Sequence, residues 1–148
     1  MKPWRIVMGS DHAGLDLKIK LKEFLIKQGC KVDDVGTHTA DSCDYPDYAV
    51  AAGKRLVAGE FDFGVLVCGS GLGISIAANK VPGVRAFPCT LEYLAEMGRR
   101  HNNANIICLG ARIVGIDLAE AIVKRFLESD FEGGRHQRRI DKIKALDE

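Results

Sequence analysis

The sequence predicts a three-layer α/β domain, in which helices cover both faces of a five-stranded parallel sheet. Short apolar runs alternate with stretches of helical periodicity along the 148 residues, and this alternation is typical of parallel sheets. The apolar run at residues 65–68 leads directly into alternate glycines at Gly69, Gly71 and Gly73. Because open α/β sheets bind ligands at the carboxyl ends of their strands, we expect the functional site there.

The chain begins with a strand and an amphipathic helix. Residues 5–9 are mostly apolar and predict the first strand. Residues 13–28 carry leucines on one helical face, and we expect the lysines of this segment, including Lys18, to turn mostly to water. Gly29 ends the helix, because glycine readily adopts the left-handed conformation found after a helix C-terminus.

The second and third units follow the same order. Residues 31–36 predict a weak strand, after which a polar loop leads to Pro46. Proline suits the first turn of a helix, and this second helix ends at Gly59. The central strand then ends at Cys68, and small and apolar residues at helical spacing follow the glycine loop.

The second half supplies two more strands and the remaining helices. Strands are expected at residues 84–87 and 105–109, with a helix at residues 91–100 between them. Residues 117–127 form another amphipathic helix, with Leu118 among the side chains expected to face the core.

The C-terminal segment differs from the rest of the chain. Gly133 and Gly134 interrupt it, and a last helix beginning at Arg135 has an apolar stripe but no neighbouring strand to pack against. We therefore expect this helix to lie across the domain or to extend toward a second subunit.

Composition excludes several classes of protein. Twenty-one basic and 20 acidic side chains leave a net charge of +1, so nothing in the overall charge attracts nucleic acid or a membrane. No segment has the apolar core of a signal peptide or of a membrane span. The cysteines are odd in number, widely spaced and without a C-x-x-C pair, which argues against a disulfide framework or structural zinc. A cytoplasmic location is therefore expected. These cysteines are Cys30, Cys43, Cys68, Cys89 and Cys108.

The glycine loop has a restricted set of interpretations. Its G-x-G-x-G spacing is not the dinucleotide fingerprint, and no lysine follows it as in a nucleotide-phosphate loop. The arginine that a cysteine phosphatase needs is absent from residues 74–76. Free backbone N–H groups and a helix N-terminus attract anions, and the same field favours the thiolate form of a cysteine. Cys68 is therefore either a reactive thiol or a small apolar core residue.

Further polar residues occur beside other strands. Asp11 and His12 follow the first strand and either line the site or cap the following helix. His101 and Asn102 precede the fifth strand, so they lie at the amino edge of the sheet and face away from the site. Either a neighbouring subunit brings them to a site or their loop is structural.

The last helix begins with a cluster of basic residues. Arg135 and Arg139 lie one turn apart and share a face, with His136 beside them. Paired guanidinium groups suit a phosphate, and Arg112, just after the fifth strand, is a further candidate. The alternative is an exposed basic helix end paired with acids such as Glu132.

Five segments together resemble the ribose-5-phosphate isomerase type B family, which also holds the subunits of galactose-6-phosphate isomerase. The resemblance covers nearly the whole chain and implies a Rossmann-like fold. It further implies homodimers or tetramers with active sites at the subunit interface, and no metal or organic cofactor. The segments are Ser10-Asp11-His12-Ala13-Gly14, Asp44-Tyr45-Pro46-Asp47-Tyr48, Cys68-Gly69-Ser70-Gly71-Leu72-Gly73-Ile74-Ser75-Ile76-Ala77-Ala78-Asn79-Lys80, His101-Asn102-Asn103-Ala104-Asn105 and Gly133-Gly134-Arg135-His136-Gln137-Arg138-Arg139.

By this resemblance, the reaction interconverts D-ribose 5-phosphate and D-ribulose 5-phosphate through an enediolate. Cys68 is then the base that moves a proton between C1 and C2, while His101 and Asp11 transfer the proton of ring opening. Ser70 and the loop amides hold the enediolate, and the basic residues bind the phosphate. The remaining implied substrate contacts are His12, Tyr45, Gly69, Gly71, Gly73, Asn102, Arg112, Arg135, His136 and Arg139.

Two alternatives stay open beside this interpretation. The first is a six-carbon substrate, allose 6-phosphate or galactose 6-phosphate; the loop at residues 37–45 and the position of the phosphate-binding residues would set the length of the sugar. A non-catalytic sugar-phosphate sensor on the same fold is the second alternative, although mere binding does not need a carbon-acid base. Ile74 stands where members with a glutamate base carry that residue, so the cysteine type fits this chain.

Overall fold

The computed structural model describes residues 1–147, and its centre is one five-stranded sheet in which all strands run parallel. The strand order is β2-β1-β3-β5-β4, which confirms the predicted parallel α/β class. Every residue of β3 and β5 is buried, because neighbouring strands and both helical layers cover them. The strands are β1 (Arg5–Ser10), β2 (Lys31–Asp34), β3 (Phe63–Cys68), β4 (Ala86–Pro88) and β5 (Ile106–Gly110).

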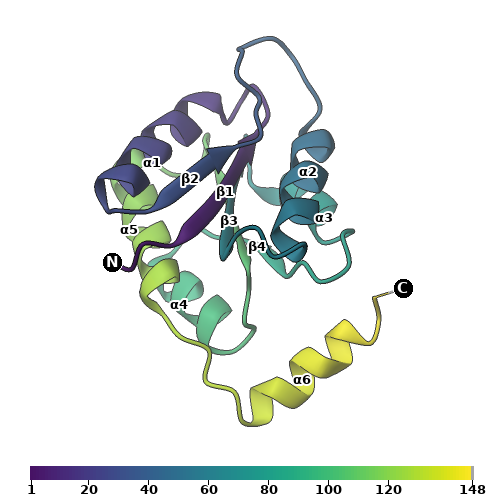
Figure 1. The fold of residues 1–148 in the computed structure, drawn as a ribbon. Helices are drawn as coiled ribbons and strands as arrows, with labels where there is room; N and C mark the ends of the chain where they lie inside the picture. Colours follow the sequence, from purple (N-terminus) through teal and green to yellow (C-terminus); the bar gives the residue numbers. More distant parts are fainter. Residues whose placement is uncertain (148) are drawn as a thin grey trace.

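Helices cover both faces of the sheet (Figure 1). Helices α1, α4 and α5 pack on one face, where Leu21, Ile107 and Phe126 belong to the larger apolar core. Helices α2 and α3 pack on the other face, over a smaller core that includes Ala52 and Ile74. The helices are α1 (Leu15–Lys27), α2 (Tyr45–Val57), α3 (Leu72–Ala78), α4 (Glu92–Arg100), α5 (Ile116–Glu128) and α6 (Arg135–Lys144).

Two side chains are oriented differently from the sequence-based prediction. Lys18 does not face water: it is fully buried, and its Nζ lies 2.8 Å from Oδ1 of Asp34 and 2.5 Å from the carbonyl oxygen of Thr37. An acceptor from the end of β2 therefore makes burial of this lysine possible. Leu118 is 40% exposed, because the buried face of α5 is formed by residues such as Ala119 and Phe126 instead.

Helix α6 stands apart from the layered body of the molecule (Figure 1). It is anchored by its buried residues His136 and Ile140, and the Asp147 carboxylate accepts a hydrogen bond from the backbone N–H of Gly83 at 2.8 Å. A groove of about 510 Å³ lies between α6 and the β4–α4 region. Leu146, which lines this groove, is 80% exposed. The last helix thus lies against the amino-edge side of the domain with most of its surface free.

None of the helices within residues 1–147 combines the length and the apolar character needed to cross a bilayer.

Candidate active site

A pocket of about 380 Å³ opens at the carboxyl edge of the sheet, where β1, β3 and β5 end. Seven of the residues predicted from the sequence line it, so the turns after these three strands and the start of α2 meet at one place. Its lining residues are Asp11, Tyr45, Cys68, Gly69, Ser70, Gly73, Arg112 and Ile113.

Cys68 ends β3 beside this pocket and is 4% exposed. Its Sγ accepts a hydrogen bond from the backbone N–H of Gly71 at 3.1 Å, and such a donor stabilises a thiolate. Gly71 has φ of +81°, and a Cβ on it would lie 3.1 Å from the backbone carbon of Leu109. The turn that aims this amide at the sulfur therefore requires glycine.

The other two loop glycines let the pocket walls approach the backbone. A Cβ on Gly73 would lie 2.5 Å from Cζ of Tyr45, and one on Gly69 would lie 3.1 Å from Nη1 of Arg112. The tyrosine ring and the guanidinium group thus lie directly against the loop. Ser70 is exposed, and its Oγ accepts a hydrogen bond from the N–H of Leu72 at 3.2 Å. Its hydroxyl hydrogen remains available to a ligand.

The residues that follow β1 have local structural partners as well as a place near the pocket. Asp11 Oδ1 accepts a hydrogen bond from the N–H of Gly14 at 3.0 Å. Gly14 is itself the N-cap of α1, which has no side-chain cap, so Asp11 closes the turn before the helix and the capping alternative is wrong. Nδ1 of His12 accepts a hydrogen bond from the N–H of Cys43 at 3.2 Å. His12 therefore links the turn after β1 to the polar loop that precedes α2.

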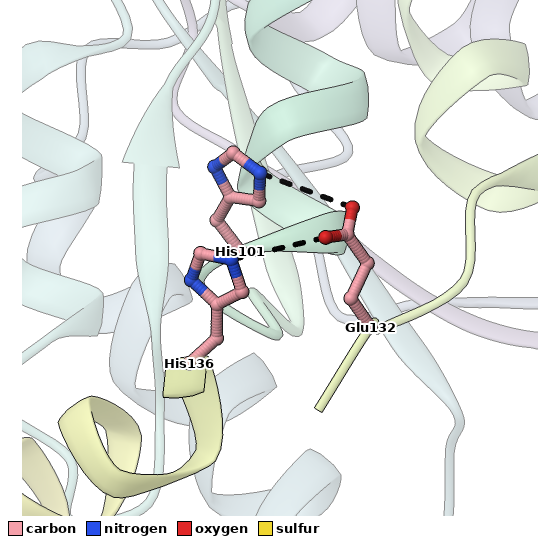
Figure 2. A group of neighbouring side chains, drawn as sticks. All are labelled: His101, Glu132 and His136. Atoms are coloured by element: carbon pink, nitrogen blue, oxygen red, sulfur yellow. Dashed lines mark ion pairs between the residues drawn. The ribbon is translucent and has the colours of Figure 1, made fainter. Parts of the chain in front are cut away.

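A second cluster consists of His101, Glu132 and His136 (Figure 2). The two imidazole rings are stacked, with centroids 4.2 Å apart and planes inclined by 10°. Nε2 of His101 lies 3.9 Å from Oε2 of Glu132, and Nε2 of His136 lies 3.8 Å from Oε1. Burial, followed by the positive charge of nearby groups, lowers the pKa of His136.

The orientation of these three side chains favours direct pairing of the imidazoles with the carboxylate over binding of one shared metal ion. Its three candidate ligand atoms lie within 4.8 Å of one another. A metal bound by an imidazole lies near the plane of the ring, along the nitrogen lone pair. Two nearly parallel rings do not direct their lone pairs at a common point, so one ion could not bind both without turning a ring.

Five predicted site residues lie outside the Cys68 pocket, on the side of the molecule that carries α6: His101, Asn102, Arg135, His136 and Arg139. Asn102 lines the groove beside α6, and His101 stacks on His136. Arg135 and Arg139 are exposed, and neither forms an ion pair within the described part of the chain. The prediction that the segment before β5 faces away from the main site is therefore confirmed.

Sequence reasoning missed two residues beside these sites. Ile113 lines the Cys68 pocket. Its position directly after Arg112, a predicted site residue, indicates from the sequence that it lies near the pocket. Glu132 had been considered only as a partner of the tail arginines. Its carboxylate instead pairs with Arg100 at 2.6 Å, a contact across 32 residues of sequence that no local pattern indicates.

Comparisons with known proteins agree with this geometry. The family model "Ribose/Galactose Isomerase" matches residues 6–143. Ribose-5-phosphate isomerase B of Escherichia coli strain K12 is 43% identical over 144 residues, with 97% of each chain covered.

Solved structures are similar along nearly the whole chain. The ribose-5-phosphate isomerase B structure from Clostridium thermocellum is 51% identical, with a TM-score of 0.95 and 96% of both chains covered. Ribose-5-phosphate isomerase B from Mycoplasma genitalium, solved with bound ribulose 5-phosphate, is 44% identical, with a TM-score of 0.91 and coverage of 95% of this chain and 94% of that one. The present chain therefore belongs to the ribose/galactose isomerase family.

Proposed function

We propose that this protein is an aldose–ketose isomerase that interconverts D-ribose 5-phosphate and D-ribulose 5-phosphate, with the whole chain forming one sugar-phosphate isomerase domain. The observation that carries the proposal is a cysteine sulfur that lines a pocket and accepts a backbone amide hydrogen bond 3.1 Å long. The names of the relatives at 43–51% identity support the same reaction.

In this proposal Cys68 is the base. Its thiolate removes the proton from C2 of open-chain ribose 5-phosphate, and the electron pair moves toward the aldehyde oxygen to form an enediolate. The same sulfur returns the proton to C1 while the hydroxyl proton on O2 passes to O1, so that C2 becomes the carbonyl carbon of the ketose. Negative charge develops only as the proton leaves, so the Ser70 hydroxyl, aimed at the new oxyanion, lowers the barrier selectively.

Ring opening and phosphate binding complete the site in our proposal. Asp11, at the pocket wall, exchanges a proton with the furanose together with His101. Arg112 binds the substrate from within the pocket, and Arg135 and Arg139 bind the phosphate with His136 beside them. The phosphate does not react, but its binding energy positions the sugar over the sulfur.

We infer that two copies of the chain build each site, in a homodimer or in a tetramer made of such pairs. One support is that His101 and Asn102, which precede β5, lie outside the Cys68 pocket. Another is that large apolar side chains are exposed both near the Cys68 pocket and on α6. Leu72 and Ile113 beside the pocket are 56% and 59% exposed, and Ile143 on α6 is 47% exposed. All five cysteines are free thiols, which supports a location in the reducing cytoplasm.

Turnover in heavy water tests the reaction directly. We expect ribose 5-phosphate to be converted to ribulose 5-phosphate with deuterium incorporated at C1, because the proton on sulfur exchanges with solvent. Label uptake measured by NMR separates an enzyme from a sensor that only binds. If no pentose or hexose phosphate takes up label, the isomerase proposal is wrong.

A six-carbon substrate is the second candidate, because the matching family model is described as a ribose/galactose isomerase. A side-by-side measurement of kcat/KM for ribose 5-phosphate, allose 6-phosphate and galactose 6-phosphate decides between them. We expect ribose 5-phosphate to give the highest value.

Replacing Arg135 tests the phosphate site. We expect Arg135→Ala to raise KM by about 10-fold to 100-fold with little change in kcat, because a charge-assisted hydrogen bond contributes roughly 1.5–3 kcal/mol. Lys144→Ala removes an exposed cation from the opposite face of the same helix and serves as the control. Equal KM values for the two variants would place the phosphate elsewhere.

A further inference from the structure

Glu132 is held firmly at the start of the C-terminal segment. Its backbone N–H donates a hydrogen bond to the carbonyl oxygen of Arg100 at 3.0 Å. Its Oε2 accepts a hydrogen bond from Nε of the same arginine at 2.6 Å. Arg100 is also held by Glu96 at 2.8 Å. Because Arg100 is the last residue of α4 and His101 follows it, the carboxylate is fixed relative to His101.

The same carboxylate faces two imidazoles. One oxygen is directed toward Nε2 of His101 and the other toward Nε2 of His136, at 3.9 and 3.8 Å. Figure 2 shows that the second nitrogen of each ring, Nδ1, lies on the side away from Glu132. The two rings therefore present the same edge to the carboxylate and the same opposite edge to their surroundings.

His136 is the more constrained of the two rings. It is 7% exposed, and its Nε2 is buried without a hydrogen-bond partner among residues 1–147. A buried nitrogen without a partner is unfavourable, and the Glu132 carboxylate is the acceptor that this nitrogen faces. A carboxylate beside one ring nitrogen favours the tautomer that carries its proton on that nitrogen.

We propose that Glu132 is a positioning residue, which holds the proton on Nε2 of His101 and His136 and so leaves Nδ1 of each ring free to face the substrate. This inference rests on the proposed function, in which His101 exchanges the ring-opening proton. Glu132 acts through the imidazoles and is not expected to touch the sugar. It would also fix the start of α6, and with it the phosphate-binding arginines, relative to His101.

The charges around the cluster agree with this role. Arg135 and Arg139 from α6, and His101 from the end of α4, all lower the pKa of His136, and burial lowers it most. Glu132 acts in the opposite direction and raises that pKa. The carboxylate itself is kept ionised, because its hydrogen bond with Arg100 lowers the pKa of Glu132.

Glu132→Gln tests the inference, with Glu96→Gln as a matched control. Both variants are isosteric and both remove one carboxylate from Arg100, but only the first changes the group that faces the imidazoles. We expect Glu132→Gln to lower kcat about 10-fold, part of the roughly 10²–10⁴-fold contribution of general acid–base catalysis. The control should stay within about 2-fold of the wild-type value.

Nitrogen-15 NMR of the full-length protein provides a readout that a purely structural role would not change. In the wild type, the proton of neutral His136 should reside on Nε2. In Glu132→Gln it should redistribute toward Nδ1, and the pKa of His136 should fall, because the negative charge that raises it is gone. Glu132→Asp should restore part of the wild-type pattern.

An unchanged tautomer or an unchanged kcat in Glu132→Gln, relative to Glu96→Gln, overturns the inference. The two proposals fail separately. If the wild-type protein isomerises no sugar phosphate, the proposed function is wrong, whereas unchanged NMR signals in an active enzyme contradict only the role of Glu132.

Discussion

Replacing Cys68 with alanine should reduce turnover of ribose 5-phosphate by about 10³-fold and leave binding of the sugar phosphate nearly intact. A positioned general base contributes roughly 10²–10⁴-fold to a rate, and no other thiol lines this pocket within the described chain. The phosphate-binding residues are unchanged in the variant. Steady-state kinetics measure the first effect, and titration calorimetry with ribose 5-phosphate measures the second.

Cys68→Ser is the matched control, because it keeps the shape of the side chain but has a far less acidic hydroxyl. It should bind substrate and remain nearly inactive. A Cys68→Ala protein that retains more than about a tenth of wild-type turnover would show that another group removes the proton.

Mixed oligomers test whether Cys68 and His101 act from different chains. His101→Asn and Cys68→Ala should each be nearly inactive alone. After the two are unfolded together and refolded, hybrid dimers contain one site in which both residues are intact, and activity should return to about a quarter of the wild-type value for random pairing. No recovery would mean that each chain supplies its own Cys68 and His101.

Replacing Lys18 with alanine should lower the free energy of unfolding by about 3–5 kcal/mol. Lys18 is fully buried, and its ammonium group lies 2.8 Å from Oδ1 of Asp34, whose side chain is only 7% exposed. Removal of the lysine leaves a buried carboxylate without its main countercharge, and breaking a buried pair in this way costs about that much. Urea unfolding followed by circular dichroism measures the change.

Two comparisons make this prediction specific. Lys22 also faces Asp34, at 3.9 Å, but its side chain is 37% exposed, so Lys22→Ala should have a much smaller effect. The double variant Lys18→Met with Asp34→Asn should recover much of the lost stability, because neither a buried charge nor its partner remains. If Lys18→Ala and Lys22→Ala lower the free energy of unfolding equally, burial of Lys18 does not explain its contribution to stability.

Local sequence patterns were sufficient for the fold and for the centre of the site. The five strands lie within a few residues of the predicted positions, because each is a short apolar run bounded by turn residues. The position of Cys68 and its loop was also predictable, because a strand end, three glycines and a helix start are adjacent in the chain. The same adjacency placed Asp11 at the turn before α1, although its bond to Gly14 closes that turn and does not cap the helix.

Other features depended on residues that are distant in the sequence. Helical periodicity placed Lys18 on a polar face, yet the end of β2 supplies Asp34 and makes its burial possible. The loop before β5 had been expected to face away from the Cys68 pocket, but its stacking on His136 of α6 was not predicted. Glu132 entered only the alternative interpretation, as a partner of the basic helix end, and its contact with Arg100 forms only when the tail returns to α4.

The amino-acid sequence by itself determined the parallel sheet, its helical layers and a thiol in a glycine-rich turn, because short-range periodicity and turn chemistry specify these features. The tertiary structure alone decided the burial of Lys18, the pairing of Glu132 with two stacked imidazoles, and the division of the candidate residues between two edges of the sheet. Those features arise from packing and charge pairing between segments far apart in the chain, and their energies appear only when the chain is folded.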